Sequence, residues 1–275
     1  MERSIAPEEK GDLIHVKSGV AYSTHAMPPY PHLAPVELSK LKAACSTCSL
    51  RELCLPAGLD HHELEKVDRL VNRRRPVRRG DYLYRSGSPL ESLYAIRSGF
   101  MKSCVLHEDG REQVAGFHMM GDVMALDAIS TGRHLCDVVA LEDSEVCEIP
   151  LARLEQLSRD IPSLQQHFHR IMSREIVRDH GVMLLLGTMR AEERLAAFLL
   201  NLSQRFAARG YSPSEFYLRM TREEIGSYLG LKLETISRAL SRFHEQKLIE
   251  VRTKYVKILD MDALREMIGV QACPE

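Results

Sequence analysis

Hydrophobic residues recur at two different spacings along the chain, and the change of spacing divides it into regions. Over residues 82–149, short hydrophobic runs alternate with glycines, which is typical of strands and turns in an all-β barrel or roll. Over residues 162–189 and 190–208, the spacing becomes three to four residues, which predicts helices. We therefore predict an α+β fold with a β-roll, a long helix and a helical C-terminal module.

The roll is expected to contain short strands bounded by glycines. The predicted strands cover residues 82–84, 93–96, 101–106, 113–117 and 138–149. The pair Asp109-Gly110 lies between two of them and indicates a hairpin turn. The basic run 73–79 precedes the first predicted strand and is interpreted as solvated surface.

The strongest local pattern lies in residues 221–246. Thr221 precedes Glu224 by three residues, which is the spacing of a helix capping box. Gly230 lies where a tight turn needs a permissive backbone. A second apolar stripe follows at helical spacing, through Leu233, Ile236, Leu240 and Phe243. This pattern predicts a helix-turn-helix, whose second helix lies in the DNA major groove, and a hairpin expected over residues 248–259 forms a wing beside it.

The side of the second helix that faces away from the apolar stripe carries Glu234, Ser237, Arg238 and Arg242. Arg238 can present two donors to a guanine, and Glu234 can accept from a cytosine amino group. Ser237 is short enough to lie close to a base edge. The alternative is an ordinary solvated helix face, but the capping box and glycine turn favour DNA reading.

Composition sets limits on the class of protein. The 275 residues are 44% hydrophobic and 27% charged, which is ordinary for a globular protein, and the formal net charge is -1. Any affinity for DNA must therefore come from local placement of charge. The charged N-terminus does not resemble a signal peptide, and no apolar run approaches a membrane span of about 20 residues. We expect a cytoplasmic protein whose cysteines are thiols or metal ligands.

Three cysteines lie close together after a proline-rich N-terminal arm: Cys45, Cys48 and Cys54. A mononuclear zinc site usually takes two close pairs of ligands, whereas one cluster with a single distant partner suits an iron–sulfur centre held by four thiolates. A small zinc site and a redox dithiol are the alternatives. Spacing alone leaves the fourth ligand open among Cys104, Cys136, Cys147 and Cys273.

Five further stretches resemble the CRP/FNR family of bacterial transcription regulators, and within it the oxygen-responsive iron–sulfur type. They are LYAIRSG (93–99), EQVAGFH (112–118), VCEIP (146–150), AEERLAAF (191–198) and LGLKLETISR (229–238). The resemblance implies a cyclic-nucleotide-binding-like jelly roll, a dimerisation helix and a winged helix-turn-helix. The expected parts are an arm with the cysteine segment (1–59), the sensor roll (60–158), the dimerisation helix (159–189) and the DNA-binding domain (190–275).

The resemblance also implies roles for particular residues. The family's distant ligand lies in the VCEIP stretch, so Cys147 would join Cys45, Cys48 and Cys54 on a [4Fe–4S] cluster. Ser49 would tune the attack of oxygen. Glu234, Ser237 and Arg238 would read palindromic TTGAT-type half-sites, with Arg242 and Thr221 as further DNA contacts. The turn that begins at Glu108 and includes Arg111 would contact RNA polymerase.

The long helix carries a possible dimer seam at spacings of four and three residues: Met172, Ile176, Asp179, Met183 and Leu186. A core helix within one subunit is the alternative, and the resemblance favours the homodimer. In a symmetric dimer Asp179 would face its own copy, and that repulsion is worth roughly 1–4 kcal/mol. We therefore expect a protein that is mostly monomeric without its cluster and dimeric with it.

Two other functions are weighed against this one. A cyclic-nucleotide binder needs a glutamate and an arginine for the ribose and phosphate, but Ala125 and Leu126 stand near the first position, and Arg133 is followed by His134. We therefore expect no cyclic nucleotide. An enzyme is not expected either, because the sequence has no nucleophile–base pair or phosphate loop. A zinc- or thiol-redox-responsive regulator on the same scaffold remains the alternative.

Overall fold

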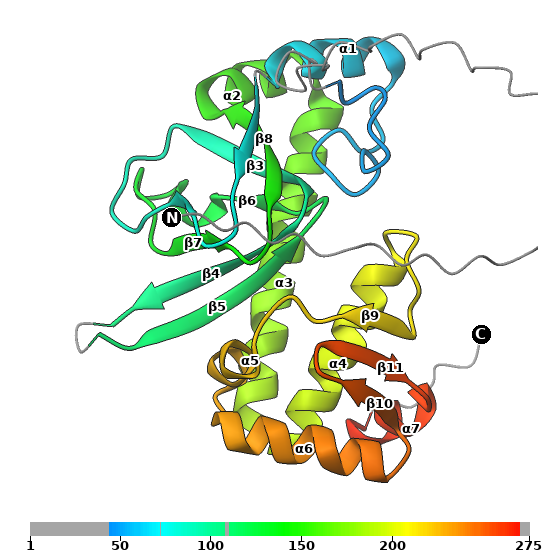
Figure 1. The fold of residues 1–275 in the computed structure, drawn as a ribbon. Coiled ribbons are helices and arrows are strands. Elements are labelled where there is room, and N and C mark those ends of the chain that lie inside the picture. Colours follow the sequence, from blue (N-terminus) through cyan, green and yellow to red (C-terminus); the bar gives the residue numbers. More distant parts are fainter. Residues whose placement is uncertain (1–43, 72, 108–109, 270–275) are drawn as a thin grey trace, which may run out of the picture. The chain divides into compact units, whose positions relative to one another are not determined.

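Two four-stranded antiparallel sheets form the roll of the protein, seen in a computed structural model that describes residues 44–71, 73–107 and 110–269 (Figure 1). The first sheet has the order β1-β8-β3-β6 and the second has the order β2-β7-β4-β5. Their strands are β1 (Arg73–Val77), β2 (Tyr82–Tyr84), β3 (Ser92–Ser98), β4 (Phe100–Leu106), β5 (Glu112–Met119), β6 (Val123–Met124), β7 (Asp137–Ala140) and β8 (Ser144–Pro150).

Three helices pack with the roll: α1 (His61–Leu70), α2 (Leu151–Asp160) and α3 (Pro162–Thr188). The first half of α3 contributes Leu164 and Ile171 to the core of the roll, so this part of the helix is fixed by burial. In its last turn, the backbone carbonyl of Leu186 accepts a hydrogen bond from Arg194 at 2.7 Å. The helix therefore contacts the roll near its start and the C-terminal module at its end.

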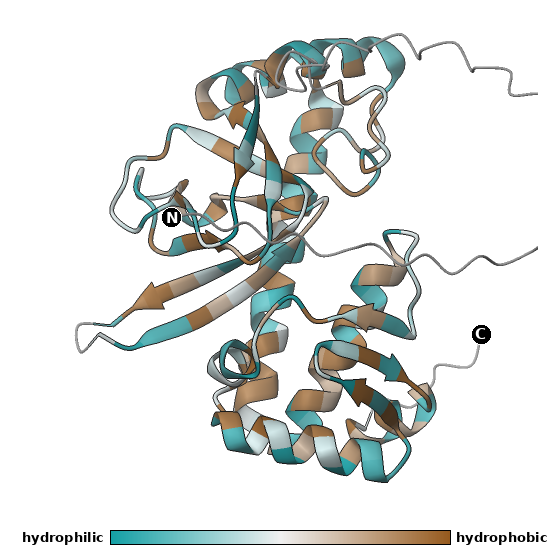
Figure 2. Ribbon diagram, viewed as in Figure 1, coloured by the Kyte–Doolittle hydropathy of each residue, from teal (hydrophilic) through white to brown (hydrophobic). Residues whose placement is uncertain are grey.

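The C-terminal module contains α4 (Ala191–Ala207), α5 (Arg222–Leu229), α6 (Leu233–Glu245), α7 (Met261–Met267) and a three-stranded sheet in the order β10-β11-β9. The strands are β9 (Glu215–Tyr217), β10 (Ile249–Arg252) and β11 (Tyr255–Ile258). In Figure 2, β10, β11 and α6 each mix hydrophobic and hydrophilic residues, as expected of elements that are buried on one side.

The predicted fold class is confirmed, and the hairpin wing is present as β10 and β11. The predicted strand 138–149 is wrong in one respect, because residues 141–143 form a turn that splits it into β7 and β8. The turn lets Ser144 pack closely on Gly99, where an added Cβ would lie only 2.1 Å from the Ser144 hydroxyl oxygen. Gly99 also has a φ of +94°, so glycine is required there.

Several elements were not predicted from the sequence pattern. The basic run 73–79 is not merely solvated surface, because its first five residues form β1, which pairs with β8. Helix α1 lies in a region predicted to hold only strands. It begins with a capping box, in which the Asp60 carboxylate accepts from the Glu63 amide at 2.8 Å and the Glu63 carboxylate accepts from the Asp60 amide at 3.0 Å. Helix α7 was not predicted.

Two details of the predicted helices also differ. The predicted long helix, 162–189, directly follows a helix that was not predicted, since Asp160 ends α2 and Ile161, buried in the core of the roll, is the N-cap residue of α3. Leu233 is 44% exposed, so it is not part of the buried stripe of α6. The buried stripe of α6 consists of Ile236, Ala239, Leu240 and Phe243.

The second hydrophobic core joins the β4–β5 hairpin to the C-terminal module. Phe117 of β5 lies against Phe198 of α4 and Tyr228 of α5, with ring centroids 6.0 and 5.2 Å apart. Phe100 and Met119 are buried in the same cluster. The hairpin is therefore structurally shared between the roll and the DNA-binding module.

Candidate cysteine centre and nucleic-acid interface

The cysteine segment, residues 44–58, is built from successive turns before α1. The amide of Cys48 donates to the carbonyl of Cys45 at 3.1 Å, and the amide of Cys54 donates to the carbonyl of Leu50 at 3.1 Å. The amide of Ala57 donates in turn to the carbonyl of Cys54 at 3.1 Å. These turns bring the three predicted cysteines onto one side of the segment, where they face one cavity.

Two side chains from distant helices fix the ends of this segment. The carboxylate of Asp68, on α1, accepts hydrogen bonds from the amide of Cys45, from the amide of Ser46 at 3.2 Å and from its hydroxyl at 2.7 Å. The Nε2 of His167, on α3, donates to the carbonyl of Cys54 at 3.1 Å. Neither residue has a local sequence signal, because each acts on a segment far away in the chain.

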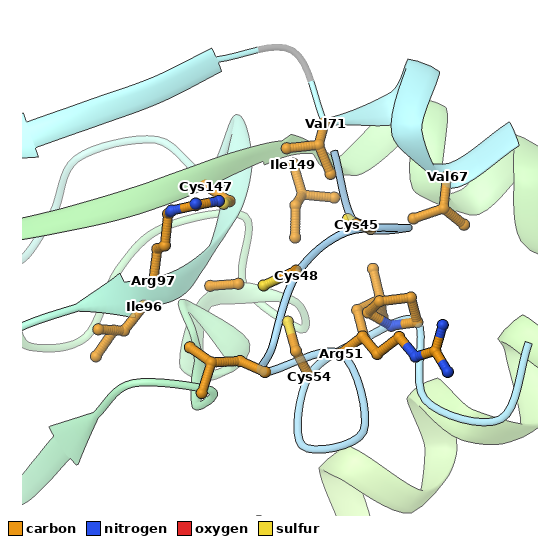
Figure 3. Close-up of a pocket in the computed structure, with 14 residues that line it drawn as sticks. Cys45, Cys48, Arg51, Cys54, Val67, Val71, Ile96, Arg97, Cys147 and Ile149 are labelled. Carbon is orange, nitrogen blue, oxygen red and sulfur yellow. The ribbon is translucent and has the colours of Figure 1, made fainter. Parts of the chain in front are cut away.

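The fourth cysteine comes from the sheet. Cys147 lies in β8, opposite Ala95 of β3 on one side and Arg74 of β1 on the other. A cavity of about 30 Å³ is lined by Cys147 together with Cys45, Cys48 and Cys54 (Figure 3). The structure therefore brings the four predicted ligands to one place.

The four thiols line one cavity but are not arranged as a metal site. Among residues 44–71, 73–107 and 110–269, no set of three or more His, Cys, Asp or Glu side chains has the arrangement of a metal site. The cavity that the four thiols line is small, about 30 Å³. The donor set itself, four thiols around one apolar cavity, suits an iron–sulfur centre.

The electrostatic surroundings of the thiols favour a bound cation over free thiolates. Burial raises the pKa of Cys45, and the neighbouring Cys54 raises it further. Burial also raises the pKa of Cys54, to about 12, and raises that of Cys147, which the nearby Arg97 opposes. Four negative charges in this space would repel one another, so thiolates here require positive charge at their centre.

Cys104 and Cys136 do not line this cavity. Cys104 is buried in β4. The Sγ of Cys136 lies 3.6 Å from a carboxylate oxygen of Asp127, across a different cavity. Cys273 falls outside the described residues.

The helix-turn-helix has the predicted local structure. The Thr221 hydroxyl accepts from the Glu224 amide at 3.1 Å, and the Glu224 carboxylate accepts from the Thr221 amide at 2.7 Å. Gly230 caps α5 with a φ of +63°, in the left-handed region. Helix α6 then buries Ile236 and Phe243 and leaves its other side exposed.

The predicted reading residues occupy that other side, but they are not equivalent. Glu234 and Arg238 are exposed, and the Nε of Arg238 donates to the Glu234 carbonyl at 3.3 Å. The Ser237 hydroxyl accepts from Arg222 at 3.2 Å. Arg242 forms an ion pair with Glu192 of α4, so its guanidinium is partly engaged within the module.

A contact that the sequence did not indicate joins the β4–β5 hairpin to α5. The Nζ of Lys102 lies 2.6 Å from the carboxylate of Glu112 and 3.1 Å from that of Glu224. The amide of Val114 donates to the Ser227 hydroxyl at 2.9 Å. The capping-box glutamate of α5, Glu224, is therefore also paired with the roll.

A second cavity, of about 430 Å³, lies between the roll and α3. Ala125 and Leu126 line it, as do the carboxylate-bearing residues Asp127, Glu175 and Asp179. Its arginine, Arg178, is an ion-pair partner of Glu175. Arg133 does not line this cavity, and its guanidinium donates to the Gly87 carbonyl at 2.6 Å.

The sequence matches two family descriptions: the cyclic nucleotide-binding domain over residues 74–160 and the Crp-like helix-turn-helix domain over residues 193–267. Two curated relatives match most of the chain. The fumarate and nitrate reduction regulatory protein of Escherichia coli strain K12 is 49% identical over 225 residues, covering 82% of this chain and 90% of its own. The transcriptional regulatory protein btr of Bordetella pertussis is 48% identical over 238 residues, covering 86% and 98%.

Among solved structures, FixK2 from Bradyrhizobium japonicum matches with a TM-score of 0.67 and 30% identity, covering 72% of this chain and 98% of that chain. The fold, a sensor roll with a Crp-like DNA-binding domain, defines a class of transcription regulators. The chain belongs to the CRP/FNR family within it. Within the described part of the chain, no helix is long and apolar enough to cross a membrane.

Proposed function

We propose that this transcription regulator responds to oxygen through a [4Fe–4S] cluster held by Cys45, Cys48, Cys54 and Cys147. The observation that carries the proposal is that these four cysteines, three from one segment and one from β8, line a single cavity. The name of the Escherichia coli relative, which refers to fumarate and nitrate reduction, agrees with a role in anaerobic metabolism. Because the named relatives are regulators, we propose no enzymatic activity.

The residues around the cavity suit a cluster held by four thiolates. When bound, such a cluster supplies an oxygen-sensitive inorganic core whose loss changes the geometry of its ligands. Arg51 and Arg97 line the cavity and offset negative charge there. Asp68 and His167 hold the cysteine segment, and Ser49, the residue after Cys48, is exposed, which supports its proposed role in tuning the attack of oxygen.

We propose that cluster-bound chains pair through α3. Ile176, Val177, Met183 and Leu184 are each more than half exposed, which leaves an unusually apolar helix face in a single subunit. Met172 and Leu186, the ends of the predicted seam, are half-buried, and Asp179 lies between them. The Asp179 pair opposes association by roughly 1–4 kcal/mol, and a shift of α3 on cluster binding offsets it.

The DNA-binding domain is proposed to read palindromic TTGAT-type half-sites through Glu234, Ser237 and Arg238 of α6, with Thr221 and Arg242 near the backbone phosphates. The exposure of Glu234 and Arg238 supports this assignment. The β4–β5 turn, which includes Arg111, is proposed to contact RNA polymerase. A regulator of this kind acts in the cytoplasm, where the DNA is.

A cyclic nucleotide is not the proposed effector. The cavity between the roll and α3 has three carboxylate-bearing residues in its wall, and Arg178 pairs with one of them. A phosphate there would lack a free arginine fork and would meet negative charge. Calorimetry with cyclic AMP should show no binding at micromolar concentration.

One experiment separates the proposed function from its alternative, a zinc- or thiol-redox-responsive regulator. Protein purified without oxygen should contain iron and acid-labile sulfide in equal amounts, and its visible absorbance should fade in air. Zinc without iron, or neither metal with reversible cysteine oxidation, would support the alternative. The raised pKa values of Cys45 and Cys54 weigh against a reactive dithiol, because a thiol must ionise to react.

A further inference from the structure

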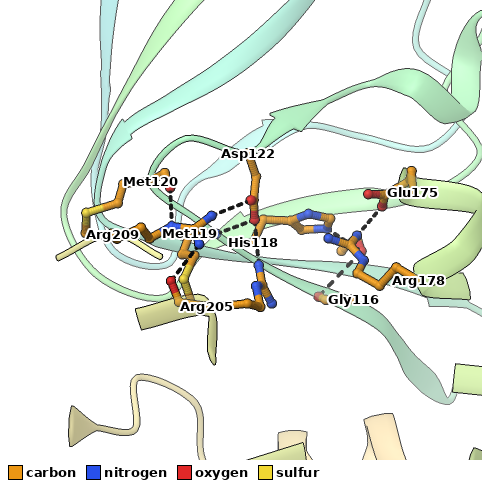
Figure 4. Close-up of polar contacts among 10 residues, drawn as sticks. Gly116, His118, Met119, Met120, Asp122, Glu175, Arg178, Arg205 and Arg209 are labelled. Atoms are coloured by element: carbon orange, nitrogen blue, oxygen red, sulfur yellow. Dashed lines mark hydrogen bonds and ion pairs between the residues drawn. The ribbon is translucent and has the colours of Figure 1, made fainter. Parts of the chain in front are cut away.

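A largely buried carboxylate joins the sensor roll to the first helix of the DNA-binding module. Asp122 lies in the turn between β5 and β6, and its two oxygens accept from Arg205 at 2.6 Å and from Arg209 at 2.7 Å (Figure 4). Both arginines lie at the C-terminal end of α4, Arg209 just beyond its last residue. The pair of arginines holds the pKa of the Asp122 carboxyl below its usual value.

The surrounding hydrogen bonds fix this contact in one geometry. The Asp122 carboxylate also accepts from the Met119 amide at 2.9 Å. Arg209 donates to the Met120 carbonyl at 2.6 Å and to the Arg205 carbonyl at 2.7 Å. The Arg209 side chain is only 6% exposed, so the strength of these contacts is little reduced by solvent.

The same turn lies against the cysteine segment on its other side. Gly121 has a φ of +88°, and a Cβ added to it would lie 3.0 Å from the Cβ of Leu53. Leu53 is the residue before Cys54, one of the proposed ligands. The turn and the segment are therefore in close contact at this point, and a displacement of Leu53 toward Gly121 presses on the turn.

There is room for such a displacement beside the turn. A cavity of about 340 Å³ is lined by Leu53, Gly121 and Asp122, by residues of α3 that include Ile171, and by Arg205 and Arg209. The cysteine segment, the turn and both helices therefore meet around one space.

We propose that the Gly121–Asp122 turn is a latch, with Asp122 as its positioning residue, that transmits the position of the cysteine segment to α4 and hence to the DNA-binding module. This inference rests on the proposed function, since it requires a segment that moves when its centre changes. A shift of Leu53 moves the turn, and α4 must follow because two buried guanidinium groups without their carboxylate are strongly disfavoured.

The test is operator binding by an Asp122→Asn variant, which keeps the shape of the side chain and removes its charge. Anaerobic iron content and dimer mass should equal those of the parent. Affinity for a duplex with two TTGAT-type half-sites, measured above the dimer dissociation concentration, should fall by about 5- to 150-fold, the usual range of a coupling between sites. Arg205→Gln should lower operator affinity to a similar extent, which controls for a folding defect specific to Asp122→Asn.

Arg219→Gln is the matched control. Arg219 also forms an ion pair with the roll, at 3.1 Å from Glu142, but no described contact joins this pair to the cysteine segment. Its operator affinity should stay within about twofold of the parent, as expected for an exposed pair. An equal loss in this variant would show that any charge between roll and module matters, and the latch would be wrong.

A double-mutant cycle distinguishes transmission from simple structural support. Leu53→Ala should weaken operator binding as well, and the double variant with Asp122→Asn should be no weaker than Asp122→Asn alone, because both act on one path. If the two substitutions lower operator affinity additively, the latch is contradicted. It is also contradicted if Asp122→Asn leaves operator affinity unchanged or loses iron. If the parent holds no iron or ignores the duplex, the proposed function itself fails.

Discussion

The helix-turn-helix and the cysteine centre are built in opposite ways. The helix-turn-helix is one continuous stretch, in which Thr221, Glu224 and Gly230 each act on immediate neighbours. The cysteine centre combines a turn-rich segment with Cys147 from the middle of a sheet, and its anchors Asp68 and His167 come from two further helices.

This difference explains how each region can serve its purpose. Local capping and a buried stripe give α5 and α6 one stable geometry, which suits a rigid surface that reads DNA. The cysteine segment is held by short turns instead of a helix or a strand and borders a small cavity, so we expect its arrangement to depend on what its ligands hold. A sensor needs that dependence, and a reading surface must avoid it.

The difference between the two regions is tested most strongly by removing the distant ligand of the cysteine centre, Cys147. Cys147→Ser should reduce iron and sulfide in anaerobically purified protein to background, because three thiolates leave one corner of the cluster without a ligand. The control is Cys136→Ser, which removes a thiol outside the cavity and should keep the parent's iron content. Elemental analysis checks both, and a Cys147→Ser protein with full iron would contradict the assignment.

The stability of the DNA-binding module should depend on its own core. Phe243→Ala removes a side chain with no exposed area and should lower the free energy of unfolding by about 3–5 kcal/mol, as measured by denaturant titration. The exposed Ser241→Ala is the control and should change it by less than about 0.5 kcal/mol. Iron content per folded chain should not change, and a change would show that the cysteine centre depends on this core.

The exposed side of α6 should affect binding without affecting stability. Arg238→Ala should weaken operator binding by about 1–3 kcal/mol per half-site and relax the preference at one base pair, because it removes a two-donor contact to guanine. The control is Arg265→Ala on α7, whose arginine pairs with Asp262 at 2.8 Å. Fluorescence anisotropy with the parent and substituted duplexes measures both, and equal losses on every sequence would mean a phosphate contact.

Measured per pH unit, the smallest expected effect concerns the roll that connects the two regions. Burial lowers the pKa of His118 to about 3, and its Nε2 lies 3.0 Å from the Ser103 hydroxyl. The unfolded chain takes up this proton near the ordinary histidine pKa of about 6.5, whereas the folded chain does not. The contribution of neutral His118 to the free energy of unfolding is therefore fully present above about pH 6.5. Below that pH the free energy of unfolding declines by roughly 1 kcal/mol per pH unit, down to about pH 3.

Denaturant titrations at several pH values check this dependence. His118→Gln should flatten the slope below pH 6.5, since the group that titrates is gone. The exposed His62→Gln should keep the parent's slope. Identical slopes in all three proteins would show that other groups control acid unfolding.

The sequence predicted the fold class and the helix-turn-helix because their signals are local. The same logic was available for α1, where Asp60 and Glu63 form a capping box, but the helix lies within a region of strand-like runs. Strand β1 was missed because its arginines suggest solvent, although the strand is held by pairing with β8. The turn that separates β7 from β8 depends on the close approach of Ser144 to Gly99, which no periodicity reveals.

The site shows the same limit. Spacing identified three cysteines, but only the family resemblance selected Cys147 over Cys104 and Cys136. The structure adds the reason, since β8 presents Cys147 to the cavity while the other two lie elsewhere. Asp68, His167 and Asp122 could not be found from the sequence, because each contacts a partner that only the folded chain brings near.

Mössbauer spectroscopy of isotope-enriched protein, purified and kept without oxygen, tests the central claim most directly. The proposed centre predicts the spectrum of a four-iron cluster bound by four thiolates, which disappears when the sample is exposed to air. A sample without iron, or an iron spectrum that air leaves unchanged, would contradict it.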